Sequence, residues 1–158
     1  MTTDNIVELT QNENKAIADK LNTLLASYQL YYQNLRGFHW NITGPRFFDL
    51  HAKFEELYTE AAVNIDEIAE RILTLDNTPL HSFKDYIDNS AITAVTQVND
   101  AETSVKTVYE NLLTLSKLGH EILKLAGEHE DEGTVTLISD MVTTQEKTTW
   151  MFKAYLKG

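Results

Sequence analysis

Residues 46–75, RFFDLHAKFEELYTEAAVNIDEIAERILTL, form the stretch that decides the fold. Their apolar side chains recur at steps of three and four, the spacing of one face of an α-helix. That stripe consists of Phe47, Phe54, Leu57, Tyr58, Ala61, Ile65, Ile68, Ile72 and Leu75. Pro45 precedes the stretch and could occupy the first position of its helix, whereas the turn-forming residues 76–79 end it. The stretch therefore predicts one long amphipathic helix.

Three further segments, residues 17–42, 99–127 and 134–156, show the same helical period. Between the second and third long helices lies a linker at residues 80–99, which is long for a bundle connection. Ser82 could cap a short helix inside this linker. Four amphipathic helices joined by one long crossover describe an all-α four-helix bundle.

Length and composition restrict the classes of protein further. The chain has 158 residues, which fits a single domain over residues 1–158. It has no cysteine, which excludes disulfides, thiolate nucleophiles and cysteine-ligated metals. Residues 1–14 contain Asp4, Glu8 and Glu13 and no basic residue, so we expect a short acidic extension. They show neither the basic nor the apolar region of a signal peptide. No apolar stretch reaches the roughly 18–20 residues of a membrane span, so we expect a cytoplasmic protein with no membrane partner.

The charge balance concerns possible partners. The chain carries 13 Lys+Arg and 24 Asp+Glu, a formal net charge of −11. This excess of negative charge argues against general binding to nucleic acid or to anionic membranes. It is compatible with a protein that handles cations.

Two pairs of potential metal ligands stand at i, i+4 spacing in residues 46–75: His51 with Glu55, and Asp66 with Glu70. At about 100° per residue, all four lie within one sector roughly 100° wide beside the apolar stripe. One such pair is commonly just part of a solvated helix face. Two pairs in one sector favour a metal site, because imidazole and carboxylate suit non-haem iron.

The spacing of the two pairs rules out one ion bound by both on the same helix. Glu55 and Asp66 are separated by roughly 16 Å along the helix axis, whereas metal–ligand bonds measure about 2.0–2.6 Å. Either the pairs are unrelated surface features, or each is half of a site that another polypeptide completes. An antiparallel partner helix related by a two-fold axis would create two identical sites per dimer.

His39 lies on the apolar stripe of residues 17–42, one turn after Leu35. An isolated histidine in such a place is usually buried and satisfied by a hydrogen bond. Because a second histidine and two carboxyl pairs stand on the next helix, we also consider His39 a candidate ligand.

Five motifs follow one another along nearly the whole chain. They are HWNITG at 39–44, FFDLH at 47–51, LY at 57–58, DEIAER at 66–71 and WMFKAYL at 150–156. Together they resemble the signature of the Dps family, the mini-ferritins also called DNA-binding proteins from starved cells.

The resemblance implies a ferritin-like four-helix subunit with a short extra helix in the crossover, and a hollow dodecamer of twelve subunits. It implies an iron site (Fe2+/Fe3+) at each two-fold interface, to which one subunit contributes His39, His51 and Glu55. Asp66 and Glu70 would come from the two-fold mate. The family usually has Asp where this chain has Glu55, whose longer side chain could still reach the site.

The activity implied by the resemblance is that of a ferroxidase. Fe(II) would be oxidised, preferably by hydrogen peroxide, and stored as ferric oxide inside the shell, which protects against oxidative damage. Trp40 and Trp150 would be auxiliary groups that take up stray oxidising equivalents; packing in the core or at an interface is the alternative.

The acidic run at residues 128–132 has two readings. It could be an ordinary solvated turn between helices, or, by resemblance, part of a three-fold pore that draws Fe(II) inward. In the second case Asp131 and Asp140 are the expected lining residues. Thr136 departs from this pattern, because many relatives have Asp there.

Three rival functions are weighed against the iron-storage reading. A general ferritin or bacterioferritin builds its diiron centre from Glu-x-x-His motifs, and none of the five histidines has Glu three residues before it. A DNA-compacting protein needs a basic tail; residues 1–14 have no basic residue and the C-terminus offers only Lys153 and Lys157, so DNA binding is not expected. A non-catalytic helical interaction protein would show no peroxide-dependent oxidation of iron.

Overall fold

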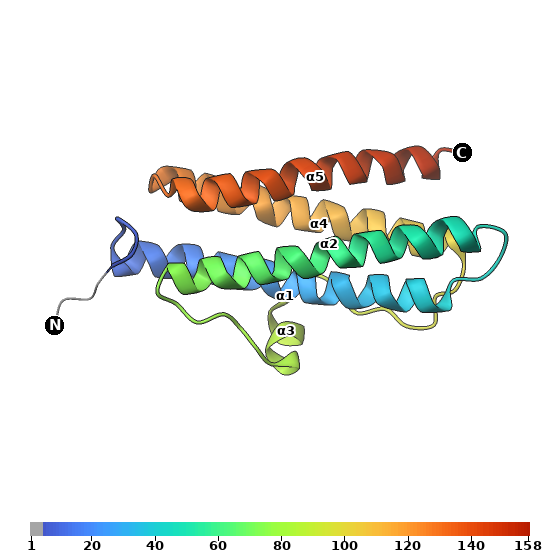
Figure 1. Cartoon of the computed structure of the whole chain (residues 1–158), viewed down its shortest axis with the longest axis horizontal. Coiled ribbons are helices and arrows are strands. Elements are labelled where there is room, and N and C mark those ends of the chain that lie inside the picture. Colours follow the sequence, from blue (N-terminus) through green and yellow to red (C-terminus); the bar gives the residue numbers. More distant parts are fainter. Residues whose placement is uncertain (1–4) are drawn as a thin grey trace.

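The computed structural model describes residues 5–158. This part of the chain contains five helices and no strand. They are α1 (Gln11–Asn41), α2 (Phe47–Thr74), α3 (Phe83–Asn89), α4 (Ala101–Glu128) and α5 (Glu132–Leu156). The four long helices lie side by side as a bundle, and the short α3 lies outside it (Figure 1). The predicted all-α bundle with a short helix in the crossover is confirmed.

Polar side chains start most of these helices. Thr10 and Glu13 form a reciprocal capping box at the start of α1, and Asp100 accepts a hydrogen bond from the Thr103 amide at the start of α4. Ser82 accepts one from the Asp85 amide at the start of α3, so the predicted cap is confirmed. Each cap satisfies an amide that the helix itself leaves unpaired.

The start of α2 differs from the prediction. Pro45 lies in the turn before the helix, and α2 begins at Phe47. The Phe47 amide donates to the Gly44 carbonyl at 3.1 Å, which makes Pro45 the second residue of a β-turn. Proline is favoured at that position because its ring fixes a suitable φ. Gly44 has a φ of 98°, which a residue with a side chain rarely adopts.

The apolar stripe of α2 faces the core of the bundle. Phe54, Leu57, Ala61, Ile68 and Ile72 are buried. The other faces of α2 therefore point away from the centre of the bundle. The predicted ligand pairs consequently lie at the edge of the core rather than within it.

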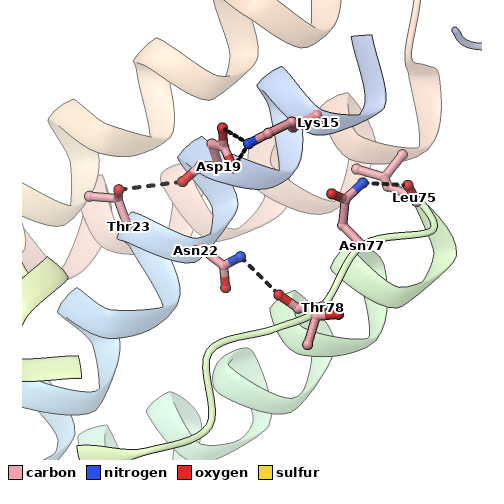
Figure 2. Close-up of polar contacts among 7 residues, drawn as sticks. All are labelled: Lys15, Asp19, Asn22, Thr23, Leu75, Asn77 and Thr78. Carbon is pink, nitrogen blue, oxygen red and sulfur yellow. Dashed lines mark hydrogen bonds and ion pairs between the residues drawn. The ribbon is translucent and has the colours of Figure 1, made fainter. Parts of the chain in front are cut away.

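Hydrogen bonds hold the beginning of the crossover against α1. The Asn22 side chain donates to the Thr78 carbonyl at 3.1 Å and accepts from the Leu80 amide at 2.9 Å. Figure 2 shows the first of these contacts, together with the hydrogen bond from Asn77 to the Leu75 carbonyl. From there the chain runs to α3, which packs against α1. The C-terminal end of α2 is thereby held beside α1.

The acidic extension expected over residues 1–14 overlaps the start of α1. Residues 11–14 form the first turn of α1, while residues 1–4 lie outside the described part of the chain. Among residues 5–158, no helix combines the length and the apolar character that crossing a membrane would require.

Candidate metal centre

His39 and His51 meet where α1 passes into α2. Their imidazole rings are stacked, with centroids 3.8 Å apart and planes inclined by 12°. The Nδ1 atom of each ring lies 2.7 Å from the backbone carbonyl oxygen of the other residue. A carbonyl oxygen only accepts hydrogen bonds, so both Nδ1 atoms carry the hydrogen. In the neutral rings both Nε2 atoms are then left as lone-pair donors to a metal ion.

Two aromatic residues flank this histidine pair. Phe47 stacks on His51 with centroids 4.9 Å apart, and Tyr58 meets His39 edge-on at 5.4 Å. His39 is only 8% exposed and His51 is half-buried. Ring packing on both sides therefore restricts rotation of the imidazoles.

Asp66 and Glu70 form the second predicted pair, towards the other end of α2. Both side chains are exposed. Hydrogen bonding to Asp66 and repulsion by its charge raise the pKa of Glu70 above its ordinary value. Two adjacent carboxyl groups can offer oxygen ligands to a cation.

A single chain brings only part of the predicted ligand set together. Glu55 is exposed one turn after His51, and Asp66 and Glu70 stand further along the same helix. Within residues 5–158, no group of three or more His, Asp or Glu side chains is arranged to hold a metal ion. The chain thus presents a histidine-bearing part and a carboxylate pair as separate groups.

The two tryptophans lie outside the core of the chain. Trp40 is 57% exposed, and its ring packs under the Arg36 guanidinium at 4.7 Å. Trp150 is 65% exposed and lines an open groove between α4 and α5. Packing in the core of the single chain is therefore excluded for both, and an interface or an auxiliary role is left.

Asp131 has a different role from the one expected of a pore-lining residue. It is 5% exposed, accepts a hydrogen bond from the Thr134 amide at 3.2 Å, and pairs with the Arg71 guanidinium at 2.6 Å. A Cβ atom at Gly133 would come within 2.7 Å of that guanidinium. Because its carboxylate caps α5 and ties it to α2, we correct the pore prediction and retain only Asp140, which is exposed on α5.

Some of these features were missing from the sequence-based prediction. The Asp-x-x-Thr pattern at the start of α5 is a helix-cap signal that could have indicated the role of Asp131. Phe47 and Tyr58 belong to the predicted apolar stripe and to the family motifs, but neither pattern indicates that they contact the histidines. No sequence signal indicates the reciprocal bonds between the histidine rings and the backbone.

Comparison with known sequences identifies the family. The model of the ferritin-like domain matches residues 18–158. DNA protection during starvation protein 2 of Bacillus anthracis is 41% identical over 146 residues, which cover 90% of this chain and 98% of that protein. The DNA protection during starvation protein of Porphyromonas gingivalis is 38% identical over 150 residues, 95% of this chain and 94% of that protein.

Solved structures give the same result. The crystal structure of the Dps protein from Vibrio cholerae O1, described as a ferritin-like diiron-carboxylate protein, superposes with a TM-score of 0.95 at 45% identity, covering 99% of this chain and 98% of that one. Dps from Staphylococcus aureus gives a TM-score of 0.87 at 34% identity, covering 90% and 95%. The chain therefore belongs to the Dps family of ferritin-like proteins.

Proposed function

We propose that this protein is a ferroxidase and iron-storage mini-ferritin. It oxidises Fe(II) with hydrogen peroxide and stores the product as ferric oxide inside a dodecameric shell of its own copies. The observation that carries this proposal is the His39–His51 pair, because both Nδ1 atoms are engaged with backbone carbonyls and both Nε2 atoms remain for a metal ion.

A second copy of the chain completes the site. One subunit supplies His39, His51 and Glu55, and its two-fold mate supplies its own Asp66 and Glu70. The separation of roughly 16 Å along α2 between Glu55 and Asp66 supports the arrangement, because antiparallel α2 helices would bring the His51/Glu55 pair of one chain beside the Asp66/Glu70 pair of the other.

Exposed apolar side chains on α2 and α3 also support assembly. Phe83 and Ile87 on α3 are 84% and 66% exposed, and Val63 on α2 is 55% exposed. Large apolar side chains that are left in water and gather into a patch commonly mark an interface. Burial against a second copy would remove them from solvent.

The ligand types fit the chemistry. Imidazole nitrogen suits Fe(II), and carboxylate oxygen favours Fe(III) once it forms. Two bound ions together supply two electrons: 2 Fe(II) + H2O2 + 2 H+ gives 2 Fe(III) + 2 H2O. Paired oxidation of this kind releases no hydroxyl radical. The net charge of −11 per chain raises the local concentration of Fe(II), and Asp140 is retained as a candidate pore residue.

The test is Fe(II) oxidation by hydrogen peroxide under anaerobic conditions. We compare wild type with Asp66→Ala and use Glu67→Ala as a matched control, because Glu67 is the exposed neighbour of Asp66 and is not a proposed ligand. We expect a large loss of rate in Asp66→Ala and near wild-type rates in Glu67→Ala. Equal rates in wild type and Asp66→Ala would refute the assigned site.

A further inference from the structure

A polar hollow lies where α1 begins and α2 ends, at the opposite end of α1 from His39. Asn5 and Asn14 contribute to its wall from the start of α1 and the segment before it, and Asp76 and Asn77 contribute from the turn after α2. Its volume of about 300 Å³ leaves room for an ion together with several water molecules, since each water takes about 30 Å³ in the liquid.

Asn14 carries a buried oxygen atom that lacks a partner. The residue is 3% exposed, and its Oδ1 atom accepts no hydrogen bond within residues 5–158. The Nδ2 atom of the same amide donates to Asn5 Oδ1 at 3.4 Å, and both residues line the hollow. A buried acceptor without a donor is costly, and a bound cation is one of the groups that relieve this cost.

The turn after α2 brings two further oxygen donors to the hollow. The Asp76 amide donates to the Leu73 carbonyl at 2.9 Å, and the Asn77 amide donates to the Ile72 carbonyl at 3.1 Å. These two bonds form a Schellman motif, which fixes the backbone at the end of the helix. The Asn77 Nδ2 atom donates to the Leu75 carbonyl at 2.8 Å, so the side-chain oxygen of Asn77 faces away from that carbonyl (Figure 2).

The charge around the hollow favours a cation. The hollow lies at the C-terminal end of α2, where the helix dipole is negative, and Asp76 adds a carboxylate. Lys15 also lines the hollow, but its Nζ atom lies 2.9 Å from Asp19 Oδ2, which balances its charge (Figure 2). The chain as a whole carries a net charge of −11.

We infer that this hollow binds a calcium ion through the Asp76 carboxylate, the side-chain oxygens of Asn14 and Asn77, and water. Ca2+ takes roughly six to eight oxygen ligands in a flexible geometry, and amide oxygens and water are among them. None of the described residues that line the hollow is a histidine, which argues against metal ions that prefer nitrogen. A single carboxylate among neutral oxygens predicts weak binding, with a dissociation constant on the order of 10⁻⁴ to 10⁻³ M.

Binding has a structural consequence that can be measured. The ion would join the start of α1 to the turn after α2, two segments separated by about 60 positions in the sequence. Local opening of either segment would release the ion, so calcium should suppress that opening. None of the proposed iron ligands takes part, and the site is therefore independent of iron oxidation.

The experiment measures hydrogen–deuterium exchange by mass spectrometry on the assembled protein, with calcium chloride or magnesium chloride added over this concentration range. Asp76→Asn removes the charge and keeps the size, and Asn tolerates the positive φ of 57° at this position. Asn14→Leu removes the unpartnered oxygen at similar volume. Glu8→Gln is the matched control, because Glu8 is an exposed carboxylate of the same segment that does not line the hollow.

With calcium at about ten times the dissociation constant, exchange in residues 5–15 and 75–77 of wild type should slow about tenfold. Glu8→Gln should behave like wild type, whereas Asp76→Asn and Asn14→Leu should show no response. Magnesium should act less, because it gives up its waters reluctantly.

Three results would overturn the inference. The first is the absence of any slowing by calcium in wild type, and the second is slowing that persists in Asp76→Asn or Asn14→Leu. The third is loss of the response in Asp66→Ala, because calcium would then act at the proposed iron site. The proposed function is tested separately by Fe(II) oxidation in the same preparations without calcium.

Discussion

His39 and His51 form reciprocal hydrogen bonds: each imidazole Nδ1 lies 2.7 Å from the other residue's backbone carbonyl oxygen. Their rings stack with centroids 3.8 Å apart. The acceptors are backbone atoms, so they persist when one of the two side chains is removed. These two hydrogen bonds join the last turn of α1 to the second turn of α2. The Nε2 atoms that we propose as metal ligands are therefore oriented by the fold itself.

The turn between these helices should be sensitive to its glycine. Gly44 has a φ of 98°, where a side chain is strained, so Gly44→Ala should lower the free energy of unfolding by about 1–3 kcal/mol. Gly37→Ala is the control: Gly37 lies inside α1 with open space around it, and alanine there should stabilise by about 0.5–1 kcal/mol. Urea unfolding measures both. Equal effects of the two substitutions would argue against strain at Gly44.

Asp131 should matter for stability rather than for iron entry. Removing one partner of a buried ion pair leaves the other charge uncompensated, so Asp131→Asn should cost about 3 kcal/mol in the free energy of unfolding. Asp19→Asn breaks the exposed pair with Lys15 and should cost less than about 1 kcal/mol. Denaturant unfolding distinguishes the two. Slower iron uptake in Asp131→Asn with unchanged stability would instead support the pore role.

Glu70 should titrate above the ordinary range for a glutamate. Its pKa is raised by Asp66, so protonated Glu70 is favoured in the folded chain. That contribution to stability is present below the pKa of Glu70 in the unfolded chain and is lost as pH rises through the raised value in the folded chain. NMR titration of the metal-free protein should show the raised pKa and its return towards normal in Asp66→Asn. A pKa that does not move in this variant would remove Asp66 as the cause.

DNA should not be retained by this protein near neutral pH. A chain with a net charge of −11 repels the phosphate backbone, and residues 5–14 supply no Lys or Arg. A mobility-shift assay at low salt, where electrostatic binding is strongest, should show free DNA at all protein concentrations. Retention that weakened as salt was added would show phosphate binding and contradict this expectation.

The sequence was sufficient to predict the helices, because the three-and-four spacing of apolar residues and the Ser82 cap are local signals. It also placed His51, Glu55, Asp66 and Glu70 beside the stripe of α2. It could not give the contacts made across the chain. Asp131 pairs with Arg71, 60 positions away, and nothing in the acidic run itself indicates that partner.

The reciprocal hydrogen bonds between His39 and His51 could not be predicted for a similar reason. They depend on the turn around Gly44, which sets the distance between two backbone carbonyls and two rings. Pro45 could stop the preceding segment or open α2, because both a turn and a helix start accept proline. Tyr58 was assigned to the core stripe, since its spacing alone cannot show that its edge meets His39.

The central claim is that one site draws ligands from two subunits, and mixed assemblies of two inactive variants test it most directly. His51→Ala and Asp66→Ala are unfolded together and reassembled, and Fe(II) oxidation by peroxide is measured. In a mixed dimer, the chain with intact histidines faces the chain with intact carboxylates, so one of its two sites is whole. With random pairing, we predict recovery of about a quarter of wild-type activity. Activity no greater than that of the separate variants, in assemblies shown by native mass spectrometry to contain both chains, would contradict the shared site.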